Sequence, residues 1–142
     1  MDDCLFCQLS EGKIPAKVVH QDPHTIAFLD IAPRSPGHTM VIPRVHAAVL
    51  SELPPEEVEP LFRSVQKVSQ ILKRSLSPDG LTIGINEGTV SGQAVPHLHV
   101  HIMTRFQNDR GGSIHSAVNN PPKETLDEIL QRITKGSAQP NT

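Results

Sequence analysis

The most regular hydrophobic pattern of the chain lies near its middle and predicts one long helix. In "PEEVEPLFRSVQKVSQILKRS" apolar residues recur every three to four positions, and a proline followed by two glutamates suits a first helical turn. We therefore expect a helix over about residues 55–75, ended by the turn signal "SPDG". Shorter helices are expected at residues 5–9 and over "KETLDEILQRI". Residues 107–121 show no regular period, and the final "GSAQPNT" is expected to fray.

Five shorter segments, rich in β-branched and aliphatic residues, predict strands. Turn signals such as "DPH", "APRSPG" and the glycine-bearing "GTVSGQAV" separate them. With 142 residues and no internal repeat, the chain is expected to form a single domain over residues 1–142. The predicted strands are "KVVHQ" at 17–21, "TIAFLD" at 25–30, "HTMVIP" at 38–43, "LTIGINE" at 81–87 and "PHLHVHIMTRF" at 96–106.

The last of these segments carries an array of histidines. His97, His99 and His101 alternate with aliphatic residues, and side chains two positions apart share one face of a strand. A single histidine is most often a structural residue. Three in alternation indicate a surface at which protons or a metal ion are handled, because imidazole titrates near neutral pH and binds metals.

Composition narrows the classes of partner. The net charge is −2, and the chain has no basic run and no Trp or Tyr, which argues against an extended nucleic-acid surface. A small anionic ligand is still compatible with this charge. No segment approaches the roughly 20 apolar residues that span a bilayer, and the acidic start "MDDCLFCQLS" lacks the pattern of a signal peptide. We therefore expect a cytoplasmic protein with no membrane contact.

The two cysteines form a pair, Cys4-x-x-Cys7. In a reducing compartment this spacing favours a metal site or redox chemistry over a structural disulfide. Two buried cysteines with neither role are the remaining interpretation.

Together the motifs resemble those of the histidine triad (HIT) nucleotide hydrolases and transferases. The resemblance rests on "CLFCQLSEGKIPA", "AFLDIAPRSPGHTMVIPRVH", "IGINEG" and "GQAVPHLHVHIM", in that order, and covers about residues 4–106. It implies an α+β, HIT-like fold with an antiparallel sheet of about five strands, one long helix and short flanking helices, usually as a homodimer. Residues 107–142 lie outside it as a divergent C-terminal extension.

The resemblance also implies a reaction at the α-phosphorus of a purine nucleotide. Family members form a covalent nucleotidyl-histidine, and the matching nucleophile here is His99. Attack requires that the other ring nitrogen be held as a donor, which a backbone carbonyl near His97 could do. His101 would donate to the phosphoryl oxygens. His38, in "PGHTM", matches a fourth histidine that borders the phosphate pocket.

Substrate contacts follow from the same resemblance. Asp30 matches a carboxylate that binds the ribose hydroxyls; without the resemblance it would be a turn residue. Asn86, Gly92 and Gln93 match groups that hold the phosphate or the leaving group. Four apolar residues match positions that sandwich a purine, although composition alone assigns them to the core: Phe6, Leu9, Phe28 and Ile31.

In one branch of the family, common among bacterial members, a structural zinc ion is bound by two cysteines and two histidines. The matching residues here are Cys4, Cys7, His46 and His97. Four protein ligands leave no open position, as in a structural zinc site. The remaining histidines, His20, His24 and His115, match no functional position and are expected at the surface.

One position departs from the family pattern. Ser or Thr usually follows the Gly-Gln of the phosphate loop, whereas this chain has Ala94 and lacks that hydroxyl donor. We favour a hydrolase or transferase with His99 as nucleophile. Two alternatives stay open: a nucleotide-binding regulator with little turnover, and a metallohydrolase whose zinc is held by the triad and keeps an open position for water. The resemblance implies that the substrate is a nucleoside phosphoramidate, a phosphoester or a dinucleoside polyphosphate.

Overall fold

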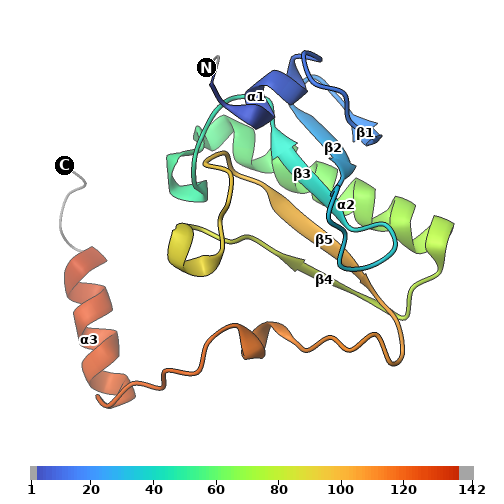
Figure 1. Cartoon of the computed structure of the whole chain (residues 1–142). Helices are drawn as coiled ribbons and strands as arrows, with labels where there is room; N and C mark the ends of the chain where they lie inside the picture. The colour runs from blue at the N-terminus through green and yellow to red at the C-terminus, as the bar shows by residue number, and fades with distance from the viewer. Residues whose placement is uncertain (1–2, 138–142) are drawn as a thin grey trace.

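The structure, a computed structural model, describes residues 3–137 and contains one five-stranded sheet (Figure 1). The strands lie in the order β1-β2-β3-β5-β4, and every neighbouring pair is antiparallel. This confirms the α+β fold class expected from the sequence. The strands are β1 (Val18–Gln21), β2 (Thr25–Leu29), β3 (Thr39–Pro43), β4 (Gly80–Gly84) and β5 (Val100–Arg105).

The long helix α2 (Pro55–Leu76) packs on one face of the sheet, against β1, β2, β3 and β5. It ends one residue beyond the predicted boundary, where Ser77 adopts a left-handed conformation and donates its N–H to the carbonyl of Lys73. Each fully buried aliphatic side chain stabilises the fold by about 1.5–3 kcal/mol. The helix buries Leu61, Val65, Val68 and Leu72 against Ala27, Val41, Val100 and Ile102 of the sheet.

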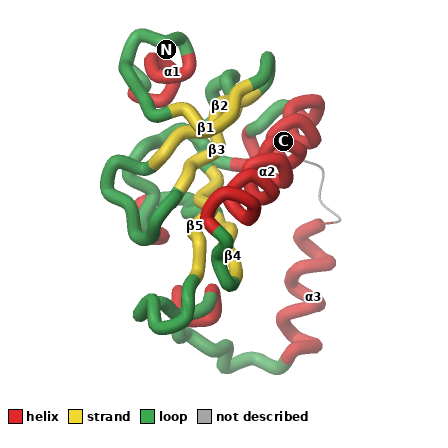
Figure 2. The backbone as a smooth tube through the Cα atoms, turned by 90° about the vertical axis from the view of Figure 1, so that its right-hand side faces the viewer, coloured by secondary structure: helices red, strands yellow, loops and turns green. Residues whose placement is uncertain are grey.

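The short helix α1 (Leu5–Ser10) lies on the opposite side of the sheet from α2 (Figure 2). It packs on β2 and β3 only, so the same face of β5 and β4 stays open. Along β5 the side chains alternate between the buried face and this open face, which carries His101, Met103 and Arg105. The fold therefore presents the end of the histidine array on an uncovered part of the sheet.

All five strands are shorter than predicted, β1, β2 and β3 by one residue each and β4 and β5 by more. β5 begins at Val100, because the backbone N–H of Leu98 donates to the carbonyl of Ala47 and not to a neighbouring strand. His97 and His99 therefore precede the strand, and only His101 lies within it. β4 begins one residue earlier than predicted and ends at Gly84, opposite His101, so the rest of "LTIGINE" is loop.

The C-terminal helix α3 (Leu126–Ser137) begins three residues later than predicted. Thr125 and Glu128 cap its first turn reciprocally: the Thr125 N–H donates to the Glu128 carboxylate at 2.8 Å, and the Glu128 N–H donates to Thr125 Oγ1 at 3.2 Å. The predicted frayed tail began at residue 136, but the helix continues through 137; residues 138–142 lie outside the described part of the chain.

α3 stands apart from the sheet and from α2, at the end of an extended segment (Figures 1 and 2). The segment contains one 3₁₀ turn, η3 (Ile114–Ala117). The apolar side of α3 is exposed, with Leu126, Leu130 and Ile133 at 81, 57 and 62% of their full accessibility. No helix among residues 3–137 is both long enough and apolar enough to cross a bilayer.

Candidate active site and metal centre

Four side chains predicted to bind a metal come together beside α1. Cys4 and Cys7 lie at the start of α1, His46 follows β3, and His97 precedes β5. His97 Nδ1 lies 3.4 Å from Cys4 Sγ and 3.5 Å from Cys7 Sγ, and His46 Nδ1 lies 3.4 Å from Cys7 Sγ. The four ligand atoms are within 4.8 Å of one another, which is the clustering that a Cys2His2 tetrahedron requires.

The chemistry of this cluster fits zinc. His97 Nε2 donates to the carbonyl of Pro43 at 2.9 Å, which leaves the lone pair of Nδ1 facing the two sulfurs. Burial and, to a smaller extent, the neighbouring Cys4 raise the pKa of the Cys7 thiol to about 11. A cation between the sulfurs would reverse this effect by stabilising the thiolates. Both cysteines are free, so no disulfide competes for them.

The backbone of His97 orients the ring of His99. Its Nδ1 donates to the backbone carbonyl of His97 at 2.7 Å, so its Nε2 carries an unprotonated lone pair. The ring is buried, with 6% of its surface exposed, and it meets the ring of Phe6 edge-on at a centroid distance of 5.2 Å. The carbonyl expected from the sequence to hold His99 is therefore the carbonyl of His97 itself.

A chain of hydrogen bonds fixes the proton on His101. The backbone N–H of Arg34 donates to His38 Nδ1 at 3.1 Å, so the His38 proton lies on Nε2. That Nε2 is 2.9 Å from His101 Nδ1 and donates to it, which leaves the proton of His101 on Nε2. Asp30 Oδ2 lies 3.6 Å from His38 Nε2. His101 is thus an N–H donor beside the lone pair of His99, at a ring-centroid distance of 5.0 Å.

Both histidines of this chain are held neutral. Burial lowers the pKa of His38, partly opposed by Asp30. Burial, followed by the neighbouring His99 and His38, lowers the pKa of His101 to about 4. The site therefore places the Nε2 atom of His99 beside a neutral N–H donor on His101.

The predicted purine-binding residues separate into two groups. Phe6, Leu9 and Phe28 lie together in the buried cluster beneath α1, with the rings of Phe6 and Phe28 5.4 Å apart. Ile31 is 100% exposed on the loop after β2. Asp30 lies half-buried beside His38. One of its carboxylate oxygens accepts the N–H of Ala32 at 2.9 Å, so Asp30 also stabilises the turn after β2.

The predicted phosphate loop is held by its own glutamine. Gln93 Oε1 accepts the N–H of Gly88 at 2.8 Å, and Gln93 Nε2 donates to the carbonyl of Ala48 at 2.7 Å. Its side chain therefore stabilises the loop, and its contact with phosphate or leaving group stays a prediction. Gly92 has a φ of +97°, which explains the glycine, and a Cβ built there would lie 4.0 Å from Asn86 Nδ2. Ala94 is exposed at the end of the loop.

Two parts of this region were not predicted from the sequence. The backbone N–H of Arg34 sets the His38 tautomer, and Arg105 binds Asp109 through two hydrogen bonds beyond the histidines on β5. A peptide N–H has no residue signature, whereas the four-residue spacing of Arg105 and Asp109 was visible but lay in an irregular segment. The other histidines are peripheral: His24 and His115 are exposed and His20 is half-buried beside Asp22.

Comparisons with known proteins agree with this geometry. The HIT domain model matches residues 11–108. The uncharacterized HIT-like protein MJ0866 of Methanocaldococcus jannaschii is 42% identical over 130 residues, which cover 92% of this chain and 98% of that protein. Adenylylsulfatase HINT3 of Arabidopsis thaliana is 32% identical over 108 residues, covering 76% of this chain and 55% of that protein.

A solved structure extends the likeness to the fold. The zinc-bound histidine triad family protein from Mycobacterium smegmatis superposes with a TM-score of 0.73 at 30% sequence identity, covering 97% of this chain and 99% of that chain. The histidine array, the fold and the family model agree over most of the chain. The chain therefore belongs to the HIT family.

Proposed function

We propose that the protein cleaves a bond at the α-phosphorus of a purine nucleoside phosphoramidate, phosphoester or dinucleoside polyphosphate, through a covalent nucleotidyl-histidine on His99. One observation carries this proposal: His99 donates its Nδ1 proton to the His97 carbonyl, so Nε2 is left as an oriented nucleophile. The relative named as an adenylylsulfatase supports hydrolysis at a nucleotide phosphorus in this family.

In the first step His99 Nε2 attacks the α-phosphorus, and the bond to the leaving group breaks with its electron pair. The N–H of His101 donates to a phosphoryl oxygen as charge shifts in the transition state. In the second step water attacks the phosphorus, the P–N bond breaks, and its electron pair returns to His99. Asp30 would accept hydrogen bonds from the ribose hydroxyls, beside the buried cluster that faces the purine.

Zinc belongs to this proposal as a structural ion. Bound by Cys4, Cys7, His46 and His97, it would connect α1 to the segment that carries the triad and stabilise that segment. The alternative of a catalytic zinc held by the triad is disfavoured, because His97 Nδ1 faces the two cysteine sulfurs while His101 Nδ1 accepts a hydrogen bond from His38. A cytoplasmic location completes the proposal, since reduced thiols persist there.

Turnover distinguishes this function from that of a nucleotide-binding regulator. Steady-state hydrolysis of adenosine 5′-phosphoramidate by the purified protein is expected, together with a mass increase of one AMP on the enzyme after rapid quenching. The covalent adduct identifies the histidine mechanism, because a metal-activated water leaves no adduct. Nucleotide binding without hydrolysis would favour the regulator.

Substitution of Ala94 tests the missing hydroxyl. Ala94→Ser is expected to raise kcat on a phosphoramidate by roughly ten- to a hundredfold, because a hydrogen bond to developing charge contributes about 1.5–3 kcal/mol. The gain should appear in kcat more than in KM, since the charge develops on the way to the transition state. Unchanged kinetics in a folded, zinc-containing Ser variant would show that alanine is tolerated here without catalytic cost.

We further propose a homodimer, in which the exposed apolar side of α3 packs on a second copy. Light scattering is expected to give about twice the 15.5 kDa chain mass for the wild type. The double change Leu130→Glu with Ile133→Glu should shift the mass toward the monomer, because two charges enter the apolar side. The control, Gln131→Glu with Lys135→Glu on the opposite side of α3, should remain dimeric. A monomeric wild type would contradict the proposal.

A further inference from the structure

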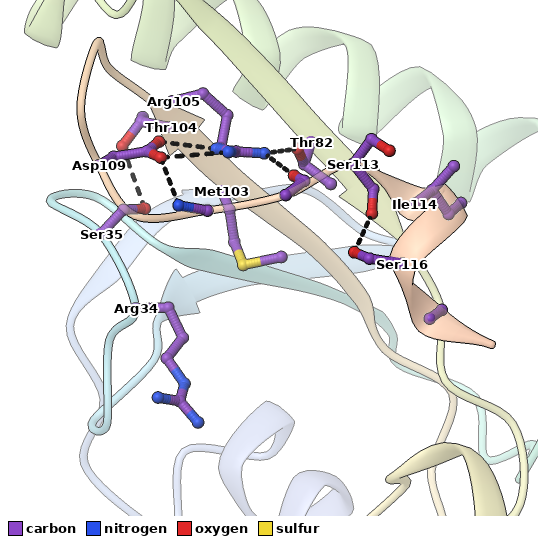
Figure 3. Close-up of a pocket in the computed structure, with 13 residues that line it drawn as sticks. Arg34, Ser35, Thr82, Met103, Thr104, Arg105, Asp109, Ser113, Ile114 and Ser116 are labelled. Carbon is purple, nitrogen blue, oxygen red and sulfur yellow. Dashed lines mark hydrogen bonds and ion pairs between the residues drawn. The ribbon is translucent and has the colours of Figure 1, made fainter. Parts of the chain in front are cut away.

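Thr104 lies on β5 three residues after His101, on the opposite face of the strand, and its side chain is buried. Its hydroxyl reaches the loop that precedes β3: Thr104 Oγ1 donates to the carbonyl of Pro36 at 2.6 Å and lies 3.2 Å from Ser35 Oγ. Figure 3 shows the side chains of Thr104 and Ser35 in contact. Thr104 therefore ties this loop to β5, without facing the reacting centre itself.

The loop contains a tight turn at residues 35–38. The carbonyl of Ser35 accepts the N–H of His38 at 3.1 Å, and Gly37, which follows a proline, has a φ of +84°. This combination defines a type II turn. In a type I turn of the same four residues the middle peptide is turned over, and glycine permits both forms. Because Thr104 donates to the carbonyl of that peptide, it holds the turn in the type II form.

The turn positions the backbone donor that fixes the proton of His38. Arg34 directly precedes the turn and His38 is its last residue, so the turn brings the Arg34 N–H to His38 Nδ1. The Asp30 carboxylate also favours a proton on His38 Nε2, but at 3.6 Å it lies beyond the usual range of a hydrogen bond. The Arg34 N–H is therefore the direct hydrogen bond that selects this tautomer.

The two imidazoles of this chain of hydrogen bonds have a second possible arrangement of their protons. In the first, both rings carry the proton on Nε2, so that His38 donates to His101 and His101 presents its own N–H to the site. In the second, His38 carries its proton on Nδ1, its Nε2 becomes an acceptor, and His101 donates from Nδ1. The number of protons is the same in both arrangements. The second, however, leaves a lone pair on His101 Nε2 and removes the donor beside His99.

We infer that Thr104 is a positioning residue: by holding the turn, it keeps the Arg34 N–H on His38 and so keeps an N–H donor on His101 Nε2. The effect of Thr104 on the reaction rate rests on the proposed function, in which this donor faces the phosphoryl oxygens. Its effect on the histidines does not depend on turnover, because the tautomers of His38 and His101 are properties of the free protein.

Three substitutions of buried threonines test this role. Thr104→Val keeps the shape of the side chain and removes the hydroxyl, whereas Thr104→Ser keeps the hydroxyl. Thr25→Val is the matched control, because Thr25 is also buried on a strand and its hydroxyl bonds to Ser64 Oγ at 2.6 Å, away from the triad. Each valine variant loses one buried hydroxyl contact, so a purely structural role of Thr104 predicts similar losses of stability and unchanged histidines at both positions.

Nitrogen-15 NMR of the histidine rings reads the tautomers, because protonated and unprotonated ring nitrogens resonate far apart. In the wild type and in Thr25→Val, His38 and His101 are expected to carry their protons on Nε2. In Thr104→Val the signals of both rings are expected to shift toward the Nδ1–H form, and Thr104→Ser should keep the wild-type signals. Arg34→Pro, which removes the backbone N–H itself, should give the same direction of shift as Thr104→Val.

Steady-state kinetics on adenosine 5′-phosphoramidate measure the consequence for the reaction. For Thr104→Val, kcat is expected to fall about tenfold, a partial form of the hundredfold or greater loss that follows removal of a whole oxyanion donor. KM should change by less than about twofold, because the donor acts in the transition state. Thr104→Ser and Thr25→Val should keep kcat within about twofold of the wild type.

A shift of both tautomers with a lower kcat in Thr104→Val, and neither change in Thr104→Ser, supports the positioning role. Wild-type ring signals in a folded Thr104→Val protein would overturn it, as would a tautomer shift without a fall in kcat. An equal fall in kcat in Thr25→Val would also overturn it, because the effect would then be one of stability. A wild type that does not turn over the phosphoramidate contradicts the proposed function instead, and the ring signals then decide whether Thr104 sets the tautomers.

Discussion

Replacing His99 by alanine is expected to abolish turnover: kcat should fall by roughly a thousandfold or more, while nucleotide affinity stays close to that of the wild type. The nucleophile acts in the chemical step and contributes little to ground-state binding. The side chain presents the Nε2 lone pair, which the methyl group of alanine cannot replace. The measurements are kcat on adenosine 5′-phosphoramidate and the dissociation constant of AMP by calorimetry.

His24→Ala is the matched control, because His24 is exposed on the turn between β1 and β2 and contacts Glu57, away from the triad. It should keep wild-type kinetics. The covalent adduct seen by mass spectrometry in the wild type should disappear in His99→Ala and persist in the control. A His99→Ala protein that retains a tenth of the wild-type rate would rule out this histidine as the nucleophile.

The second large effect concerns the metal cluster. Protein prepared without chelator is expected to contain about one zinc per chain, and Cys4→Ser or His46→Ala should lower Tm by on the order of 10 °C. Loss of a metal is among the few changes that destabilise a domain this strongly. The effect on kcat at a temperature where the variants stay folded should be much smaller, since the zinc is structural in this proposal.

Three measurements define this test: elemental analysis, thermal unfolding followed by circular dichroism, and kcat. His20→Ala serves as a control outside the cluster, since His20 lies beside Asp22. Chelation should reproduce the loss of stability in the wild type, and added zinc should reverse it there but not in Cys4→Ser. An elemental analysis without metal would refute the zinc assignment.

The fold was largely predictable, because its elements carry strong periodic signals. The amphipathic pattern gave the long helix to within one residue at its C-terminus, and all five strands were placed in the right segments. The predicted element boundaries are wrong where local hydrogen bonds override the periodic pattern of apolar residues. The start of β5 moved because Leu98 bonds to Ala47, and the start of α3 moved because Thr125 and Glu128 form a capping box that was present in the sequence.

The candidate site was predictable in its side chains and not in its backbone. Motif resemblance brought Cys4, Cys7, His46 and His97 together, and the structure clusters them. The resemblance could not show that the side chain of Gln93 bonds to Gly88 and Ala48, because these hydrogen bonds depend on the path of the backbone at both residues. The position of residues 111–117 beside β4 and β5 was not predicted for a similar reason, since these residues lie in an irregular segment.

His97 takes part in two structures at once: its ring belongs to the metal cluster, and its carbonyl receives the proton of His99. A mutation of His97 is therefore ambiguous as an experiment, because a fall in rate after such a change mixes a lost ligand with a misdirected nucleophile. His46 is the cleaner probe, since its ring contacts the cluster while its backbone lies outside the triad segment. Comparing rates at these two positions would separate the loss of a metal ligand from a change in the orientation of His99.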